Sequence, residues 1–191
     1  MTQLRASTER LEPRRDPDAA AVRAAQRDRR AFEVLYRRYL DRVYAYAFYA
    51  LGDHHDAEDA TERAFLAALK GIDRYRDTGA GFRAWLFRIA HNTVSNAMRS
   101  RRRKGTQPLP DGWERAAPNA DPATLVARAE EGRRVLRAVR ELPVDRRQVV
   151  LLRFVDELSA AEIGEVLDRS PGAVRVLLHR ALRDLATRLE T

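Results

Sequence analysis

The 191-residue sequence contains no cysteine. This absence excludes a disulfide framework, a zinc site built on thiolates and a cysteine nucleophile. No apolar run approaches the length of a membrane span, and the first residues lack the apolar core of a signal peptide. We therefore expect a cytoplasmic protein that makes no membrane contact of its own.

Sequence motifs for catalysis or cofactor binding are also missing. There is no GxxxxGK phosphate loop, no GxGxxG dinucleotide turn and no GxSxG nucleophile elbow. His54 and His55 are adjacent, but neighbouring side chains at a helix start point apart and would not chelate one metal ion. We expect no catalytic residue, no metal site and no cofactor.

Lysine is scarce, because Lys70 and Lys104 are the only lysines among 36 basic residues. The basic residues outnumber 28 acidic ones, which gives a formal net charge of +8 and a pI of about 10.5. A balance this basic points to a polyanionic partner such as nucleic acid. Arginine binds phosphate in a bidentate manner, although a GC-rich genome would produce the same preference for arginine.

Apolar residues recur at helical spacing through most of the chain, and no stretch shows the alternation of a strand. A first helix is expected to begin at Asp16-Pro17. Residues 1–15 are polar and charged without periodicity, which predicts a disordered tail. Further helices are expected over Arg30–Leu51, over Asp53–Ile72 and within Phe82–Lys104, where Arg101–Lys104 should lie past the helix end.

Residues 105–121 contain three prolines and two glycines, which predicts a flexible linker at a domain boundary. A helix should then open at Asp121-Pro122 and end at Leu142-Pro143, and another should span about Val144–Asp156. The expected fold class is all-α, with two small helical domains at 16–104 and 122–191 joined by that linker.

The end of the chain has the pattern of a helix-turn-helix. Ser159 and Glu162 form a capping box, Asp168 to Ser170 break the helix, and Pro171 suits the first position of a second helix. That second helix should bury Val174, Leu177, Leu178, Ala181, Leu182 and Leu185. Its other face is basic, with Arg175, His179, Arg180 and Arg183. A DNA-binding motif is favoured over a helical hairpin with a solvated cationic face.

The stretch Phe82–Lys104 has seven basic residues and no acid. A helical wheel places one arc inward, formed by Phe82, Trp85, Leu86, Ile89, Thr93 and Ala97. The opposed arc contains Arg88, His91, Asn92, Ser95 and Arg99. A surface without acids is typical of an element that follows phosphates. By contrast, five acids lie between Asp53 and Glu62, more than the helix dipole requires, so part of that run is expected to face a basic protein surface.

The order of these segments carries a family resemblance. DAEDATERAFLAALKGIDRY is followed by FRAWLFRIAHNTVSNAMRSRRR, a linker, ELPVDRRQVVLLRF and the helix-turn-helix. This order resembles the bacterial sigma factors of the extracytoplasmic-function (ECF) group, in roughly residues 17–104 and 123–188. The resemblance implies that 16–104 is region 2, that 122–191 is region 4, and that the chain is a non-enzymatic subunit that directs RNA polymerase to promoters.

For region 2, the resemblance implies docking on the β′ clamp helices of core polymerase and binding of the −10 element as a single strand with a flipped base. The positions matching the docking surface are Asp59, Glu62, Arg63, Phe65 and Leu69. The family more often has Gln-Glu where this chain has Glu62-Arg63. The positions matching the −10 surface are Arg76, Thr78, Gly79, Arg83, Arg88, His91, Asn92, Ser95, Arg99 and Arg102.

For region 4, the resemblance implies binding of the −35 element in the major groove, contact with the β flap and an anti-sigma partner. The matching −35 positions are Ser170, Pro171, Gly172, Ala173, Arg175, Val176, His179 and Arg180. Asp168-Arg169 replaces a Gly-aliphatic pair, and we expect Asp168 to tolerate the left-handed turn. The alternatives are a stand-alone helix-turn-helix regulator and an enzyme or RNA-binding helical protein.

Overall fold

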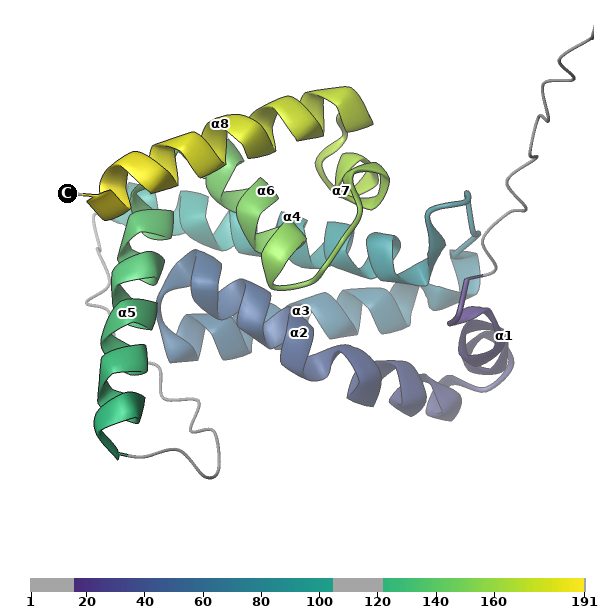
Figure 1. Ribbon diagram of the computed structural model, residues 1–191. Helices are drawn as coiled ribbons and strands as arrows, with labels where there is room; N and C mark the ends of the chain where they lie inside the picture. Colours follow the sequence, from purple (N-terminus) through teal and green to yellow (C-terminus); the bar gives the residue numbers. More distant parts are fainter. Residues whose placement is uncertain (1–15, 105–121, 191) are drawn as a thin grey trace, which may run out of the picture.

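The computed structural model describes residues 16–104 and 122–190 (Figure 1). Within these ranges the chain forms eight α-helices and two short 3₁₀ helices, and it forms no strand. The all-α prediction is therefore confirmed. The predicted tail at 1–15 and the predicted linker at 105–121 lie outside the described residues, and the domain boundaries stay a prediction.

Most boundaries in the first group of helices follow local signals, but α4 continues through Lys104, although Arg101–Lys104 was predicted to lie past its end. Gly52 takes the left-handed conformation, with φ of 76°, and ends the second helix. The Asp53 side chain then accepts a hydrogen bond from the Asp56 amide at 2.9 Å and begins the third. The elements are α1 (Ala19–Arg27), η1 (Arg29–Phe32), α2 (Glu33–Leu51), α3 (His54–Gly71), η2 (Ile72–Arg74) and α4 (Gly81–Lys104).

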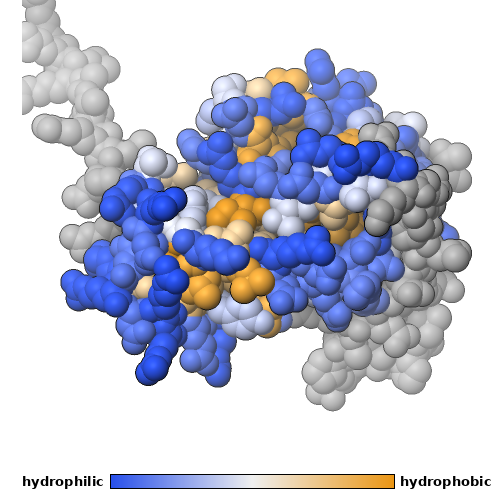
Figure 2. Space-filling model, turned by 180° about the vertical axis from the view of Figure 1, so that it is seen from behind, coloured by the Kyte–Doolittle hydropathy of each residue, from blue (hydrophilic) through white to orange (hydrophobic). Residues whose placement is uncertain are grey.

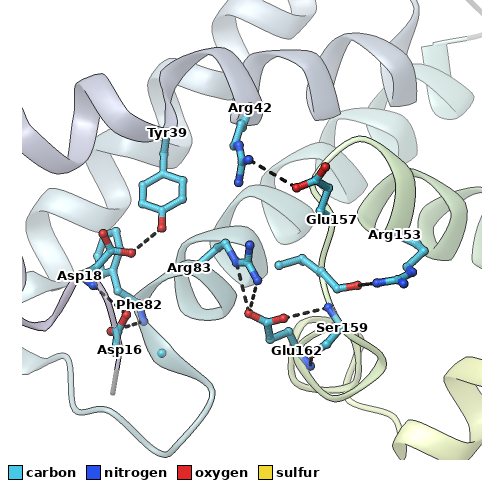
Figure 3. A network of polar contacts seen from close by, with 12 residues as sticks. Asp16, Asp18, Tyr39, Arg42, Phe82, Arg83, Arg153, Glu157, Ser159 and Glu162 are labelled. Carbon is cyan, nitrogen blue, oxygen red and sulfur yellow. Dashed lines mark hydrogen bonds and ion pairs between the residues drawn. The ribbon is translucent and has the colours of Figure 1, made fainter. Parts of the chain in front are cut away.

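The prediction that Asp16-Pro17 begins a helix is wrong, because α1 begins at Ala19. One carboxylate oxygen of Asp16 accepts from the Asp18 amide at 3.0 Å. The other accepts from the Phe82 amide at 2.8 Å, in the first turn of α4 (Figure 3). Asp16 thus caps a helix 66 residues away, a contact that local sequence patterns do not reveal. Asp18 is fully buried and binds Arg38 and the Tyr39 hydroxyl.

The second group comprises α5 (Pro122–Glu141), α6 (Val144–Phe154), α7 (Ala160–Leu167) and α8 (Pro171–Glu190). The predicted capping box is confirmed: Ser159 Oγ accepts from the Glu162 amide at 3.2 Å, and Glu162 Oε2 accepts from the Ser159 amide at 2.8 Å. Asp168 has φ of 55°, as the predicted left-handed turn requires. Ser170 Oγ accepts from the Ala173 amide at 3.2 Å and begins α8.

The two groups of helices pack against each other through α4 with α7 and through α2 with α6. Figure 1 shows α6 and α7 lying over α4, and the buried residues form one continuous core. The sequence did not predict this contact between the two groups. We call this packing of α6 and α7 on α2 and α4 the closed arrangement.

Two predictions about buried faces need correction. In α4, Phe87, Ala90 and Val94 are buried although the helical wheel did not place them inward, whereas Trp85 and Ile89 are only half-buried. The helix is covered by α2 and α3 and also by α7, so a single inward arc underestimates its buried surface. In α8, Leu182 was predicted inward but is 43% exposed.

Candidate nucleic-acid and protein interfaces

The turn of the helix-turn-helix is tight enough to require glycine at position 164. A Cβ at Gly164 would lie 2.5 Å from the Arg169 carbonyl oxygen, closer than non-bonded atoms tolerate. Arg169 itself reaches back to Asp145 of α6, with Nη2 3.0 Å from the carboxylate. No role for Gly164 was predicted from the sequence. The one available indication that the backbone comes close here was a glycine four positions before the turn.

The basic face predicted on α8 is open to solvent. Seven of the eight predicted −35 positions are exposed, and Ala173 is half-buried beside the Ser170 cap. α8 packs against α6. The residues that it buries are Val174, Ala181 and Leu185. Its N-terminal half therefore presents backbone, cationic and apolar groups together, which is the arrangement needed in a major groove.

The predicted −10 surface is divided in the closed arrangement. Its exposed part comprises Arg76, Thr78, Gly79, Arg88, Asn92 and Arg99. The side chain of Arg102 lies outside the described residues. The remaining three positions, Arg83, His91 and Ser95, are half-buried on the side of α4 that α6 and α7 cover. Six of the ten positions are thus exposed in the structure.

The loop before α4 has a defined shape. The Asp77 carboxylate accepts hydrogen bonds from the Gly79 amide at 2.8 Å and from the Gly81 amide at 3.1 Å. Gly79 and Gly81 both have positive φ, at 100° and 80°, a conformation that favours glycine. Asp77 therefore fixes the backbone of this loop through residues 79–81, a positioning role that was not predicted from the sequence.

His91 does not contribute a positive charge to this surface. Its Nδ1 lies 3.1 Å from the Tyr46 hydroxyl, and its Nε2 lies 3.5 Å from Ser95 Oγ. Burial lowers the pKa of His91, an effect that the charge of Asp145 partly opposes. The imidazole is consequently neutral near pH 7, and it offers hydrogen bonds instead of an ion pair.

An open groove of about 700 Å³ runs between α2 and α3. Phe65 forms its apolar floor, with the Tyr36 ring packed edge-to-face at 4.8 Å between ring centroids. Glu33, Glu58 and Glu62 line the groove together with Arg29, so its charged lining is mainly acidic around an apolar floor. Exposed apolar surface between hydrophilic side chains is also visible on the face of the molecule shown in Figure 2.

The groove contains three of the five positions predicted to dock on polymerase, namely Glu62, Phe65 and Leu69. The other two, Asp59 and Arg63, form an exposed ion pair with each other at 3.1 Å and do not line it. Leu66, which lines the groove and is 46% exposed, was not predicted from the sequence. Its position outside the buried side of α3 was the only indication that an exposed apolar residue lies there.

Within residues 16–104 and 122–190, no three His, Asp or Glu side chains gather as metal ligands. In the same part of the chain, no helix is both long and apolar enough to cross a membrane.

Two parts of the chain match known families. Residues 35–104 match Sigma-70 region 2, and residues 132–185 match Sigma-70, region 4. The first match covers most of α2 together with α3 and α4, and the second extends from α5 into α8. The two groups of helices therefore contain the two regions of a sigma-70-type transcription factor.

Individual relatives indicate which group of sigma factors the chain resembles. The chain is 34% identical over 179 residues to the ECF RNA polymerase sigma factor BldN of Streptomyces coelicolor, covering 91% of this chain and 68% of BldN. It is 31% identical over 170 residues to the ECF RNA polymerase sigma factor SigW of Bacillus subtilis, covering 85% of this chain and 90% of SigW. The structure of CnrH in complex with the cytosolic domain of CnrY is similar with a TM-score of 0.70 and 27% identity, over 92% of this chain and 98% of CnrH.

The chain belongs to the ECF RNA polymerase sigma factors. The resemblance inferred from the sequence is thereby confirmed. As a sigma factor, the chain works with RNA polymerase and directs it to promoters. Sigma factors are not enzymes in general.

Proposed function

We propose that the two groups of helices divide promoter recognition between them. In this proposal the exposed N-terminal half of α8 binds the −35 element, and α4 with the loop before it binds the −10 element. The groove between α2 and α3 docks on core polymerase. The observation that supports the proposal most directly is that α8 and α4 each present a separate exposed basic surface.

The α8 surface suits duplex DNA. Arg175, His179 and Arg180 are all exposed on this helix. Arginine pairs in a bidentate manner with guanine edges or phosphates, and the exposed Val176 suits a thymine methyl group. This combination provides both positioning on phosphates and recognition of bases.

The α4 surface suits a single strand. The Gly79 backbone is exposed and has positive φ, so a base can approach the loop closely. The Asn92 amide can form hydrogen bonds with the edge of an unpaired base, while Arg88 and Arg99 neutralise phosphates. The loop and α4 therefore offer the donors, acceptors and cations that a single strand of the −10 element requires.

The groove between α2 and α3 suits a basic helical partner. An aromatic floor provides the apolar anchor that interfaces depend on, and the surrounding carboxylates attract cations. We assign this groove to the β′ clamp helices of core polymerase and the region 4 helices to the β flap. The polymerase and its promoters lie in the bacterial cytoplasm, so the chain is proposed to act there without catalysis of its own.

An anti-sigma partner is also proposed. CnrH, which is similar over nearly its whole length, was solved in complex with the cytosolic domain of CnrY. Capture of the chain by a protein that covers one of its three surfaces would prevent promoter binding.

We expect Arg175→Ala to lower promoter-dependent transcription at least about tenfold, the effect of losing one bidentate contact. Run-off transcription with core polymerase over a genomic promoter library measures this loss. The matched control is Arg188→Ala, in the last turn of the same helix, where the side chain lies 3.7 Å from Glu141. Equal activity of the two variants would contradict the assignment of α8 to the −35 element.

We expect Leu66→Ala to weaken binding to core polymerase about tenfold, because an exposed leucine that lines a groove with an apolar floor is a candidate anchor. The affinity is measured by fluorescence anisotropy of the labelled chain. Val34→Ala is the control, since Val34 is 51% exposed on α2 but does not line the groove. Unchanged binding in both variants, or failure of the unmodified chain to co-elute with core polymerase, would overturn the docking proposal.

A further inference from the structure

The start of the described chain lies against the loop proposed to bind the −10 element, although it precedes the family match. The match to Sigma-70 region 2 begins at residue 35. We call residues 16–28, which include α1, the α1 segment. α1 packs against η2 and against α4, the two elements that the loop of residues 75–80 connects. The surfaces assigned above leave the α1 segment without a function.

Gln26 of α1 holds the first residue of this loop. Its Nε2 donates to the Ile72 carbonyl and to the Tyr75 carbonyl, each at 3.0 Å. Both N–H groups of one half-buried amide are thus used on backbone 46 and 49 residues away. Nearby, Arg29 and Asp73 form an ion pair at 2.6 Å, but their side chains are 62% and 44% exposed. An exposed pair contributes little, so Gln26 is the stronger contact at this end.

Asp16 holds the other end of the loop. Its carboxylate accepts from the Phe82 amide at 2.8 Å (Figure 3). A Cβ on Gly81 would lie 3.3 Å from Cγ and Oδ1 of Asp16, so the carboxylate lies directly against the backbone at the start of α4. The α1 segment therefore contacts the chain on both sides of the loop.

The α1 segment is itself fixed to α2 and can serve as a support. Asp18 is 0% exposed and binds Arg38 and the Tyr39 hydroxyl. Val22 and Ala25 are buried in the core. A buried carboxylate with two partners is costly to displace, so the positions of Asp16 and Gln26 relative to α2 are well defined.

The shape of the loop and its placement have different origins. Asp77 bonds the loop to itself through the amides of Gly79 and Gly81. The placement of that unit depends on its two ends. The Tyr75 carbonyl that Gln26 binds also accepts from Arg76 at 2.8 Å, so Gln26 and a predicted −10 residue share one anchor. Recognition requires groups held within about 0.5 Å of the productive geometry, so placement should affect base selection.

We propose that the α1 segment positions the loop of residues 75–80, with Gln26 and Asp16 as positioning residues, and thereby sets the base preference at the −10 element. Both residues act through the backbone of the loop and not through contact with DNA. This inference rests on the proposed assignment of the loop to the −10 element. Loss of either residue should displace the same loop and alter the same promoter positions.

Base preference in a promoter library tests the proposal. A promoter that the genomic library identifies is randomised over both elements, and transcripts made by core polymerase with the full-length chain are sequenced. Gln26→Leu removes both donors and keeps a side chain of similar size. We expect the preference for the favoured −10 bases to fall about tenfold, the scale of one net hydrogen bond, while the −35 preferences stay unchanged. Loss of folded protein would instead lower transcription from all promoters alike.

A second variant acts at the other end of the loop. Asp16→Ala removes the acceptor of the Phe82 amide and should alter preference at the same −10 positions as Gln26→Leu. The control is Ala24→Leu, which places leucine at an exposed position of the same helix and should leave the preferences unchanged. Circular dichroism verifies that each variant is folded.

Hydrogen exchange on the free chain tests the positioning without polymerase or DNA. The Tyr75 amide donates to the carbonyls of Gly71 and Ile72, and we expect Gln26→Leu to speed its exchange about tenfold. Unchanged exchange, or a uniform loss of transcription with unaltered preferences, would overturn the proposal.

Thr78→Ala, within the loop itself, separates the two levels of the argument. An altered −10 preference in Thr78→Ala, together with unaltered preferences in Gln26→Leu and Asp16→Ala, would overturn the positioning role alone. Unaltered preferences in all three variants would overturn the assignment of the loop to the −10 element as well.

Discussion

Phe87→Ala should destabilise the chain by about 3–5 kcal/mol, the cost of truncating a fully buried phenylalanine. Phe87 is 0% exposed in α4, and its ring packs edge-to-face on Tyr46 with 6.0 Å between centroids. The cavity would open in the core that α2 and α4 share. Urea unfolding followed by circular dichroism measures the change in the free energy of unfolding.

Phe154→Ala is the matched control for this substitution. Phe154 ends α6 and is 59% exposed, so its removal should change the free energy of unfolding by no more than about 0.5 kcal/mol. Similar losses in the two variants would show that burial of Phe87 is not what stabilises the helix pair.

Gly164→Ala should destabilise the helix-turn-helix by about 1–3 kcal/mol, the usual cost of overpacking. The new methyl group would be placed 2.5 Å from the Arg169 carbonyl, and backbone cannot move aside as a flexible side chain does. The turn must therefore open, which displaces α8 from α7. Urea unfolding measures the loss, and hydrogen exchange should localise it to residues 160–180.

Gly132→Ala provides a control of opposite sign. Gly132 lies within α5, and a Cβ there would meet nothing within 4 Å. Alanine should consequently stabilise the helix by about 0.5–1 kcal/mol through its better helix propensity. A loss of stability at Gly132 equal to that at Gly164 would contradict the steric explanation.

Local signals in the sequence were sufficient to predict most helix boundaries. Gly52, the Ser159–Glu162 box and the Ser170-Pro171 pair act within a few residues of the ends they define, so their effect can be inferred without tertiary structure. The exposed basic face of α8 could be predicted for the same reason, since its periodicity is a property of one helix.

Contacts between distant segments could not be predicted in this way. The cap that Asp16 provides to α4, the groove completed by Leu66 and the bonds from Gln26 to the backbone at Ile72 and Tyr75 each depend on helices that meet only in the folded chain. A helical wheel assumes one buried side, and α4 is covered on more than one. The −10 surface is divided into exposed and covered parts because α6 and α7 cover a second side of α4. The periodicity of apolar residues in α4 does not predict this contact.

The bond from Asp16 to the Phe82 amide has a practical consequence for probing this protein. It places the start of the described chain directly beside the loop proposed to bind an unpaired base. A fluorophore on a cysteine introduced in place of Pro17, which is exposed, would therefore lie close to that loop. Under the proposed −10 assignment, we expect its emission to change when the promoter strands separate, with no residue of the loop itself altered.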